Sequence, residues 1–285
     1  MKYGVIDVGS NSVRLMISDG VNLLTKTVKT TQLAKGLVND LLDEQAVLRT
    51  AQAVSFFYNQ AKEQQVDEIY AFATAAVRKA NNKQLFIDAV KALCGLEVEV
   101  VSGETEAELG CLGALAGSDG GVIDVGGAST EISVYDKGKK AYGKSIYLGA
   151  VNTTDLCGQD KTNSTKLVLE KLKEFNIVPK AKFYAIGGTA TSLAAIMQQL
   201  EPYDPLKTDG YVIELGQLQQ TVDKLFSLSV EDRKLLKGLQ PARAEVIANG
   251  ALIVLEIMKN IGISSLIVSE KDNLEGYLIN KRKNV

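Results

Sequence analysis

Two short segments of the sequence combine an aspartate with a glycine-rich turn, a pattern suited to binding phosphate and a metal ion. Residues 4–13 read GVIDVGSNSV and residues 121–130 read GVIDVGGAST, so Asp7 and Asp124 occupy equivalent positions. Alternating apolar residues follow both copies, which indicates strand, tight turn and strand in each. Successive backbone N–H groups in such a turn bind phosphate oxygens, and glycine permits positive φ and close approach of a ligand.

A carboxylate beside a bound phosphate is repulsive unless a hard cation lies between them. Mg²⁺ prefers few carboxylates, with water and phosphate oxygens completing its shell. We therefore predict that Asp7, Asp124 and Glu131 hold Mg²⁺ or another divalent cation. The alternative for either turn alone is a hairpin that its aspartate merely stabilises. The predicted phosphate-binding residues are those of the two turns: Gly9, Ser10, Asn11, Ser12, Gly126, Gly127, Ala128, Ser129 and Thr130.

A third glycine-rich turn, Gly187, Gly188 and Thr189, follows a predicted strand and opens a predicted helix. Phosphate binds favourably at a helix N-terminus, and we add these residues to the phosphate-binding set. The same residues could equally well serve only to cap the start of the helix. Residues 138–145, GKKAYGKS, match the P-loop pattern but lie in a predicted hairpin, and a P-loop needs a helix after it.

The sequence contains no histidine, which excludes the Ser-His-Asp triad, the Cys-His pair and nearly all mononuclear zinc hydrolases. A general base must therefore be a carboxylate, a lysine or a tyrosine. Residues 101–109, VSGETEAEL, precede the second aspartate turn and are expected at the cleft, where a glutamate is the natural base for a hydrolytic water. Acidic residues also suit the first turn of any helix, so a purely structural role stays open.

The remaining pattern predicts an α/β fold with two similar lobes and a central cleft. We assign residues 1–118 plus 270–285 to the N-terminal lobe and residues 119–269 to the C-terminal lobe. The predicted strands are 23–29, 68–73, 96–101, 182–186 and 265–269, and the predicted helices are 43–65, 82–93, 105–115, 166–175 and 274–283.

Composition limits the partners. The net charge of −2 argues against nucleic-acid binding by bulk charge. No stretch approaches the ~20 apolar residues of a membrane helix, and the three cysteines form no CxxC pair. We expect a soluble, cytoplasmic protein with reduced thiols that binds neither nucleic acid nor membrane. A homodimer is left open.

Taken together, these motifs resemble those of the exopolyphosphatase/guanosine pentaphosphate phosphohydrolase (Ppx/GppA) family, within the actin/Hsp70/sugar-kinase superfold with ribonuclease H-like lobes. The likeness extends from Met1 to about Tyr277 and includes Arg14 after the first turn. It implies that Arg78, in the element Thr74-x-x-x-Arg78, contacts substrate phosphate and that Glu106 is the catalytic base. The element from Arg243 to Glu245 is also similar.

The resemblance implies a magnesium-dependent hydrolase that releases terminal orthophosphate from inorganic polyphosphate or guanosine pentaphosphate. Three departures bear on substrate preference and turnover: Thr105, Ala128 and the segment 269–272, which lacks a glycine. Two other functions remain open: a non-catalytic sensor of polyphosphate or an alarmone, and a phosphotransferase of the sugar or acetate kinase type. A filament-forming cytoskeletal protein is a third option, which the chain length and the Glu106 element disfavour.

Overall fold

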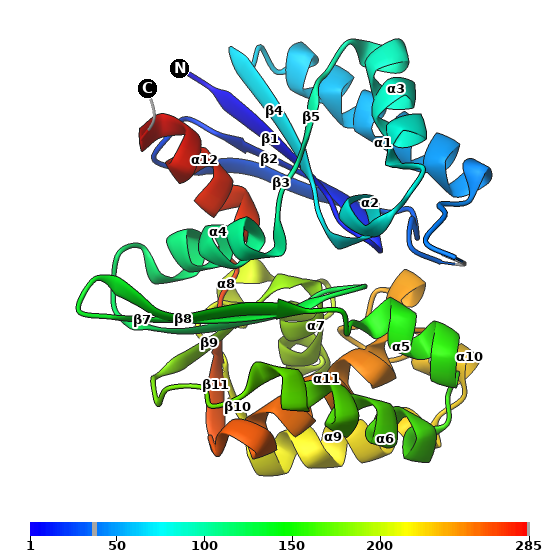
Figure 1. Ribbon diagram of the computed structural model, residues 1–285, viewed down its shortest axis with the longest axis vertical. Coiled ribbons are helices and arrows are strands. Elements are labelled where there is room, and N and C mark those ends of the chain that lie inside the picture. Colours follow the sequence, from blue (N-terminus) through cyan, green and yellow to red (C-terminus); the bar gives the residue numbers. More distant parts are fainter. Residues whose placement is uncertain (36–38, 284–285) are drawn as a thin grey trace.

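The computed structural model describes residues 1–35 and 39–283 as two α/β lobes, one above the other in Figure 1. The upper lobe has a five-stranded sheet in the order β3-β2-β1-β4-β5. Its hairpin strands are antiparallel, whereas β4 runs parallel to β1 and β5 runs parallel to β4. The strands are β1 Tyr3–Val8, β2 Ser12–Ser18, β3 Leu23–Thr30, β4 Glu68–Ala73 and β5 Val98–Val100.

The lower lobe repeats this arrangement with a six-stranded sheet in the order β10-β11-β9-β6-β7-β8. Its first three strands again form an antiparallel meander, and β9 runs parallel to β6 as β4 does to β1. The strands are β6 Gly120–Val125, β7 Thr130–Asp136, β8 Lys139–Ile146, β9 Phe183–Ile186, β10 Val212–Glu214 and β11 Ser265–Val268.

Helices cover both sheets. In the upper lobe and between the lobes they are α1 Glu44–Glu63, α2 Ala75–Lys79, α3 Lys83–Cys94, α4 Gly103–Leu115 and α12 Asn273–Lys283. In the lower lobe they are α5 Ala150–Cys157, α6 Lys161–Leu172, α7 Gly187–Gln198, α8 Pro205–Thr208, α9 Leu215–Ser227, α10 Val230–Arg233 and α11 Ile247–Ile261, with 3₁₀ turns at Lys173–Phe175 and Pro241–Arg243.

Strand β1 is buried on both faces because helices cover both sides of its sheet. Ile6 and Val8 pack into the core beneath α1 and α3, while Val5 packs into the core beneath α4 and α12. A strand buried on both faces reads as a continuous apolar run, as this segment does. Asp7 is therefore the exception within an apolar strand, at the point where the strand leaves the core.

Helix α4 packs against both lobes. Leu109 lies in the core that α12 shares with the upper sheet, and Cys111 and Leu115 pack with Val122 of the lower sheet. Helix α12, from the end of the described chain, returns to the upper lobe and lies against α4 and β1. The lobe boundaries, 1–118 plus 270–285 and 119–269, remain a prediction. They place α4 at the end of the N-terminal lobe, next to the lower lobe.

The predicted fold class is confirmed: two α/β lobes carry mixed sheets flanked by helices and repeat the same hairpin. Most element ends agree within a few residues. Helices α2 and α5 and strand β10 were not predicted, and α6 begins at Lys161 rather than Lys166 because Asp160 caps it by accepting from Thr162 and Asn163. The P-loop-like segment, residues 138–145, is the end of the β7–β8 turn and most of β8, and no helix follows it as a P-loop requires.

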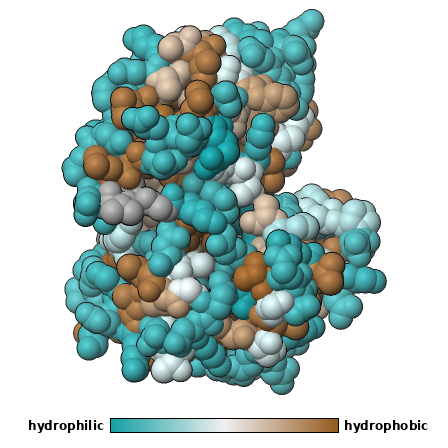
Figure 2. All heavy atoms as spheres, turned by 90° about the vertical axis from the view of Figure 1, so that its right-hand side faces the viewer, coloured by the Kyte–Doolittle hydropathy of each residue, from teal (hydrophilic) through white to brown (hydrophobic). Residues whose placement is uncertain are grey.

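Figure 2 shows the indentation that separates the two lobes on one face of the molecule, with apolar side chains scattered among polar ones. None of the helices in the part of the chain that the structure describes is both long and apolar enough to cross a bilayer.

Candidate functional site: two aspartate turns around one cavity

The two glycine-rich turns touch each other at the junction of the lobes. Each turn is closed by the same hydrogen bond, Gly9 N to Ser12 O at 3.0 Å and Gly126 N to Ser129 O at 2.9 Å. A Cβ atom placed on Gly127 would lie only 2.9 Å from Ser10 Cβ. The duplicated hairpins thus face one another closely enough for one ligand to contact both.

Glycine is needed in these turns for space rather than for backbone conformation. Gly9, Gly126 and Gly127 do not adopt positive φ, so that part of the sequence argument was wrong. A side chain on Gly9 or Gly126 would approach a carbonyl oxygen of its own turn at 3.2 Å. Helix α5 supports the second turn, because its Ala150 N donates to Gly126 O at 2.9 Å.

Asp7 lies beside Arg14 because β1 and β2 pair these two residues. Arg14 Nε donates to Asp7 Oδ2 at 3.0 Å, and Nη2 donates to the same oxygen. The other oxygen, Oδ1, is buried and has no hydrogen-bond partner. Burial raises the pKa of Asp7, while the Arg14 guanidinium opposes that rise. Asp7 therefore lines the site with one carboxylate oxygen still able to accept a ligand.

Asp124 occupies the equivalent position in the second hairpin, but its partners differ. Asn273 Nδ2 donates to Asp124 Oδ2 at 3.1 Å. Gly187 adopts φ +78° and approaches so closely that a Cβ there would lie 2.6 Å from Asp124 Oδ1. Burial, followed by the negative charge of Glu106, raises the pKa of Asp124 to about 7.

Glu131 is the counterpart of Arg14, since β6 and β7 pair it with Asp124. Two carboxyl groups opposite each other on one sheet face repel when both are ionised. Burial, then the charges of Glu106 and Asp124, raise the pKa of Glu131 well above its usual value. Ser145 Oγ donates to Glu131 Oε1 at 2.6 Å, and Glu131 does not line the cavity between the turns. Its metal-binding role remains a prediction.

Glu106 reaches the same site from the first turn of α4. Ser102 caps this helix by accepting from Thr105 N at 3.0 Å, which sets where the helix begins. The Glu106 side chain is buried, and Arg78 Nη1 donates to its Oε2 at 2.8 Å. Burial raises the pKa of Glu106, and the nearby Arg78 charge only partly offsets it. A buried carboxylate with a raised pKa is a suitable general base near neutral pH.

The third turn meets the second hairpin rather than standing apart. Thr189 Oγ1 donates to Val125 O at 2.7 Å, which ties the start of α7 to the end of β6. A Cβ on Gly188 would lie 2.3 Å from the Arg243 guanidinium. Burial, followed by the positive charge of Arg14, lowers the pKa of Arg243 to about 10. Arg243 forms no ion pair with another described residue, so a cation lies against this turn without a carboxylate partner.

These residues surround a cavity of about 100 Å³ between the lobes. Most of the predicted site residues line it: Asp7, Gly9, Ser10, Asn11, Ser12, Glu106, Asp124, Gly126, Gly127, Ser129, Gly187, Gly188 and Thr189. Four others do not. Ala128 and Thr130 are fully buried beneath the turn, and Glu131 lies behind it. Arg78 lines an adjacent open cavity of about 580 Å³ and reaches the site only through Glu106.

The sequence reasoning did not assign site roles to Arg14, Arg243 and Asn273, although all three line the cavity. Arg14 could have been assigned from the hairpin register, because seven residues separate it from Asp7 around a predicted turn. Arg243 precedes α11 and Asn273 is the first residue of α12, and both reach the site only through tertiary packing. The resemblance of the element from Arg243 to Glu245 to the family was the one signal that could have pointed to Arg243.

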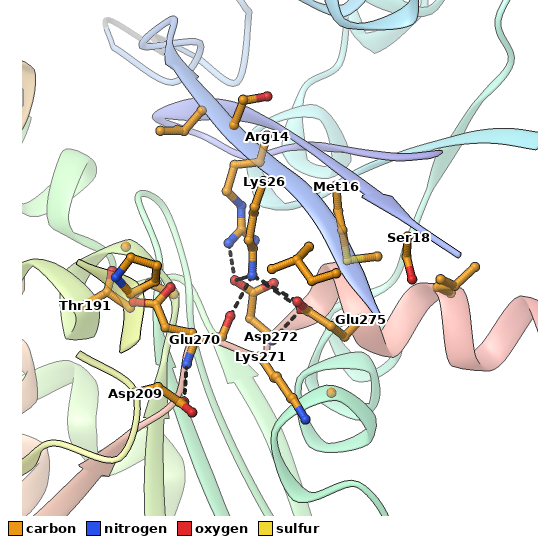
Figure 3. Close-up of a pocket in the computed structure, with 18 of the residues that line it drawn as sticks. Arg14, Met16, Ser18, Lys26, Thr191, Asp209, Glu270, Lys271, Asp272 and Glu275 are labelled. Atoms are coloured by element: carbon orange, nitrogen blue, oxygen red, sulfur yellow. Dashed lines mark hydrogen bonds and ion pairs between the residues drawn. The ribbon is translucent and has the colours of Figure 1, made fainter. Parts of the chain in front are cut away.

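A larger cavity of about 930 Å³ adjoins the first, and Figure 3 shows part of its lining. Arg14, Gly187, Gly188 and Arg243 line both cavities. The larger cavity combines apolar walls with a cluster of charged side chains around Asp272. The two cavities therefore meet at Arg14, Arg243 and the third turn.

A divalent cation fits the residues present. Asp7 has an unpartnered buried oxygen, and Asp124 lines the same cavity. Two carboxylates with room for phosphate oxygens match the preference of Mg²⁺. Within residues 1–35 and 39–283, no three cysteine, aspartate or glutamate side chains converge into a complete metal site. A cation here would thus rely on the two aspartates and on ligands from outside the chain.

Comparison with known proteins places these observations in a family. The model of the Ppx/GppA phosphatase family matches residues 13–284. A bifunctional 3-dehydroquinate synthase/phosphatase of Fusobacterium nucleatum is 30% identical over 96% of this chain, which spans 46% of that protein. Exopolyphosphatase 2 of Mycobacterium tuberculosis is 28% identical over 98% of both chains.

A guanosine-5'-triphosphate,3'-diphosphate pyrophosphatase of Aeromonas hydrophila is 25% identical over 97% of this chain, which covers 58% of the relative. The crystal structure of the Aquifex aeolicus Ppx/GppA family member is 29% identical, with a TM-score of 0.82 over 100% of this chain and 98% of that one. The likeness therefore covers both lobes, whereas two of these three relatives are considerably longer.

Proposed function

Because the chain belongs to the Ppx/GppA phosphatase family, we propose that it hydrolyses terminal phosphoanhydride bonds of inorganic polyphosphate, of guanosine pentaphosphate, or of both. The observation that carries the proposal is the contact between the two aspartate turns around one cavity that buried Glu106 also lines. The names of the relatives agree with this activity. Activities of the longer relatives that depend on their additional length are not part of the proposal.

In the proposed reaction Glu106 is the general base. A water molecule beside its carboxylate attacks the terminal phosphorus, and Glu106 accepts the proton that the water loses. The bond from that phosphorus to the bridging oxygen breaks, and the bridging oxygen leaves with the bonding electrons on the shortened chain. Phosphoryl transfer depends mainly on positioning the reacting groups and on neutralising the charge of the phosphate oxygens. A base beside the attacking water is the remaining group that the reaction needs. Arg78 orients Glu106 through the 2.8 Å contact.

The proposed phosphate-binding groups are the backbone and side chains of the two turns, from Gly9 to Ser12 and from Gly126 to Ser129. Arg14 and Arg243 line the same cavity and add positive charge. The third turn, with Gly187 and Gly188, borders the path into the larger cavity. Backbone N–H groups and a few cations suffice to bind a polyanion on a chain whose net charge is −2.

We propose that Asp7 and Asp124 hold the divalent cation, Mg²⁺ being the candidate that their chemistry favours. When bound, the ion neutralises charge on the phosphate oxygens. Glu131 is the weakest member of the proposed ligand set. Its Oε1 already accepts a hydrogen bond from Ser145 Oγ, and its raised pKa favours the protonated form, which binds a cation poorly. The same proposal includes a cytoplasmic location, where such substrates occur, and leaves a homodimer to be measured.

The test offers polyphosphate and guanosine pentaphosphate side by side with Mg²⁺ and measures orthophosphate release. Release from either substrate, lost after chelation of the metal, supports the proposal. Binding of both substrates without release across several divalent metals would instead support a sensor. Transfer of phosphate from ATP to a small acceptor would support a phosphotransferase.

A further inference from the structure

We call the cavity of about 100 Å³ between the aspartate turns the catalytic cavity. Charged side chains gather where it meets the larger cavity, whose lining Figure 3 shows in part. Arg14 lines both cavities, while Lys26, Asp272 and Glu275 line the larger one. Asp7 contacts the same arginine from the catalytic side. We call these five residues the junction cluster. They come from the three strands β1, β2 and β3 and from the start of α12, so the fold alone brings them together.

Asp272 is the central member of the junction cluster. Its Oδ2 accepts from Arg14 Nη1 and lies 3.4 Å from Lys26 Nζ. Burial opposes ionisation of Asp272, yet the charges of Arg14 and Lys26 lower its pKa to about 2. Asp272 is therefore a buried carboxylate that is ionised at neutral pH and shared between two cations.

These contacts occupy both cations. Arg14 directs Nε and Nη2 at Asp7 and Nη1 at Asp272, so each side of its guanidinium is paired. Lys26 Nζ also donates to Glu270 O at 2.6 Å and to Glu275 Oε1 at 3.2 Å. Three carboxyl groups thus face two cations along the path between the cavities. A phosphate group on that path must compete with Asp272 for Arg14 and Lys26.

We propose that Asp272 is a specificity-determining residue that withholds Arg14 and Lys26 from the phosphate groups of the substrate. It thereby weakens the binding of an all-phosphate chain that extends from the catalytic cavity into the larger one. An uncharged organic group in the larger cavity is affected less, because it gains nothing from a free cation. This inference rests on the proposed function, which places the reacting phosphates between the aspartate turns.

The charge of Asp272 can be removed without losing its structural role. Asp272 caps α12, since its Oδ1 accepts from Leu274 N at 3.0 Å. Asparagine and serine are good N-cap residues, so Asp272→Asn and Asp272→Ser should keep the helix start. Asp209 offers a matched control in the same cavity. Its Oδ1 accepts from Glu270 N at 3.0 Å and it contacts neither Arg14 nor Lys26, so Asp209→Asn removes one charge and keeps the acceptor.

The experiment is calorimetric titration with diimidotriphosphate, in which NH groups replace the bridging oxygens of tripolyphosphate. We expect Asp272→Asn and Asp272→Ser to bind it roughly tenfold more tightly than the unmodified chain, as one added charge-assisted hydrogen bond predicts. Asp209→Asn should stay within about twofold. Equal affinity of the unmodified chain and both Asp272 variants would overturn the inference, as would an equal gain in Asp209→Asn.

A parallel assay of orthophosphate release from tripolyphosphate separates this inference from the proposed function. Tighter binding by the Asp272 variants without release by any form would refute the hydrolysis and leave the role of Asp272 supported. Absence of binding by all forms would overturn both.

Discussion

Replacement of Glu106 by glutamine tests the proposed chemistry most directly. The substitution keeps the shape of the side chain and its acceptor oxygen toward Arg78 Nη1, which lies 2.8 Å from Oε2. It removes only the ability to take a proton. A positioned general base contributes ~10²–10⁴-fold to a rate, which corresponds to ~2.7–5.5 kcal/mol of activation free energy. We therefore expect kcat to fall by about that factor while substrate affinity changes little.

The pH dependence of the same pair of proteins gives a second readout. Burial, partly offset by Arg78, raises the pKa of Glu106 above its ordinary value of 4.5. Activity of the unmodified chain should therefore fall on acidification while the pH is still above 4.5, because the base becomes protonated. The residual activity of Glu106→Gln should lack this acidic limb.

Glu106→Gln should lower activity without lowering the free energy of unfolding. Because the native pKa of Glu106 is raised, the native state holds the proton more tightly than the unfolded chain. The ionised carboxylate then costs stability, and the cost grows as pH rises from the ordinary value through the raised one. Glutamine carries no such cost, although the oxygen that Arg78 contacts becomes uncharged. We expect the Tm of Glu106→Gln at neutral pH to equal or exceed that of the unmodified chain.

The assay is orthophosphate release from tripolyphosphate with Mg²⁺, combined with thermal unfolding. Glu108→Gln is the matched control, since Glu108 lies on the same helix but pairs with Lys140 outside the cavity. It should leave kcat within about twofold, as expected for a side chain remote from the reacting groups. Unchanged turnover in Glu106→Gln, or an equal loss in Glu108→Gln, would refute the assignment of Glu106 as the base.

Three further substitutions, with Gly216→Ala as a control outside the site, examine the rest of the site. Arg243→Met removes a cation that has no ion-pair partner, and it should raise KM for phosphate substrates about tenfold. The Tm of this variant should be unchanged or higher, because burial disfavours the arginine charge. An unchanged KM would contradict the role of Arg243. Gly127→Ala places a methyl group 2.9 Å from Ser10 Cβ and should separate the turns, lowering kcat/KM by about tenfold or more. Gly216→Ala, in open space on α9, should only stabilise the chain in thermal unfolding by ~0.5–1 kcal/mol. Asp7→Asn should raise the Mg²⁺ concentration needed for half-maximal phosphate release about tenfold or more, and no shift would remove Asp7 from the metal site.

Much of the architecture could be predicted because it is written in local patterns. The repeat around Asp7 and Asp124 predicts two hairpins, and the long amphipathic segment after Asp43 predicts α1, whose cap accepts from Ala46 N at 2.9 Å. Short helices such as α2 and α5 were missed because they lack an amphipathic period of their own. Their position follows from contacts with the turns, such as Val151 N to Gly127 O at 2.7 Å.

The candidate site likewise has one part that the sequence predicts and another that only the structure shows. Asp7 and Asp124 could be selected from residue type and spacing, the absence of histidine narrowed the base to a carboxylate, a lysine or a tyrosine, and the family resemblance pointed to Glu106. Whether Glu131 behaves like Asp7 could not be decided from the repeat. Cross-strand pairing places Arg14 opposite one aspartate and Glu131 opposite the other, so equivalent carboxylates meet charges of opposite sign.

By itself, the sequence determined the α/β class and the duplicated aspartate turns, because these depend on periodicity and glycine placement over short spans. Only the tertiary structure decided that the turns touch, that Arg243 and Asn273 join them, and that Asp272 occupies Arg14 and Lys26. The contacts of Asp272 join residues more than 200 positions apart in the chain, 258 for Arg14 and 246 for Lys26. Only the return of the end of the chain to the upper lobe brings Asp272 within hydrogen-bonding distance of Arg14 and Lys26.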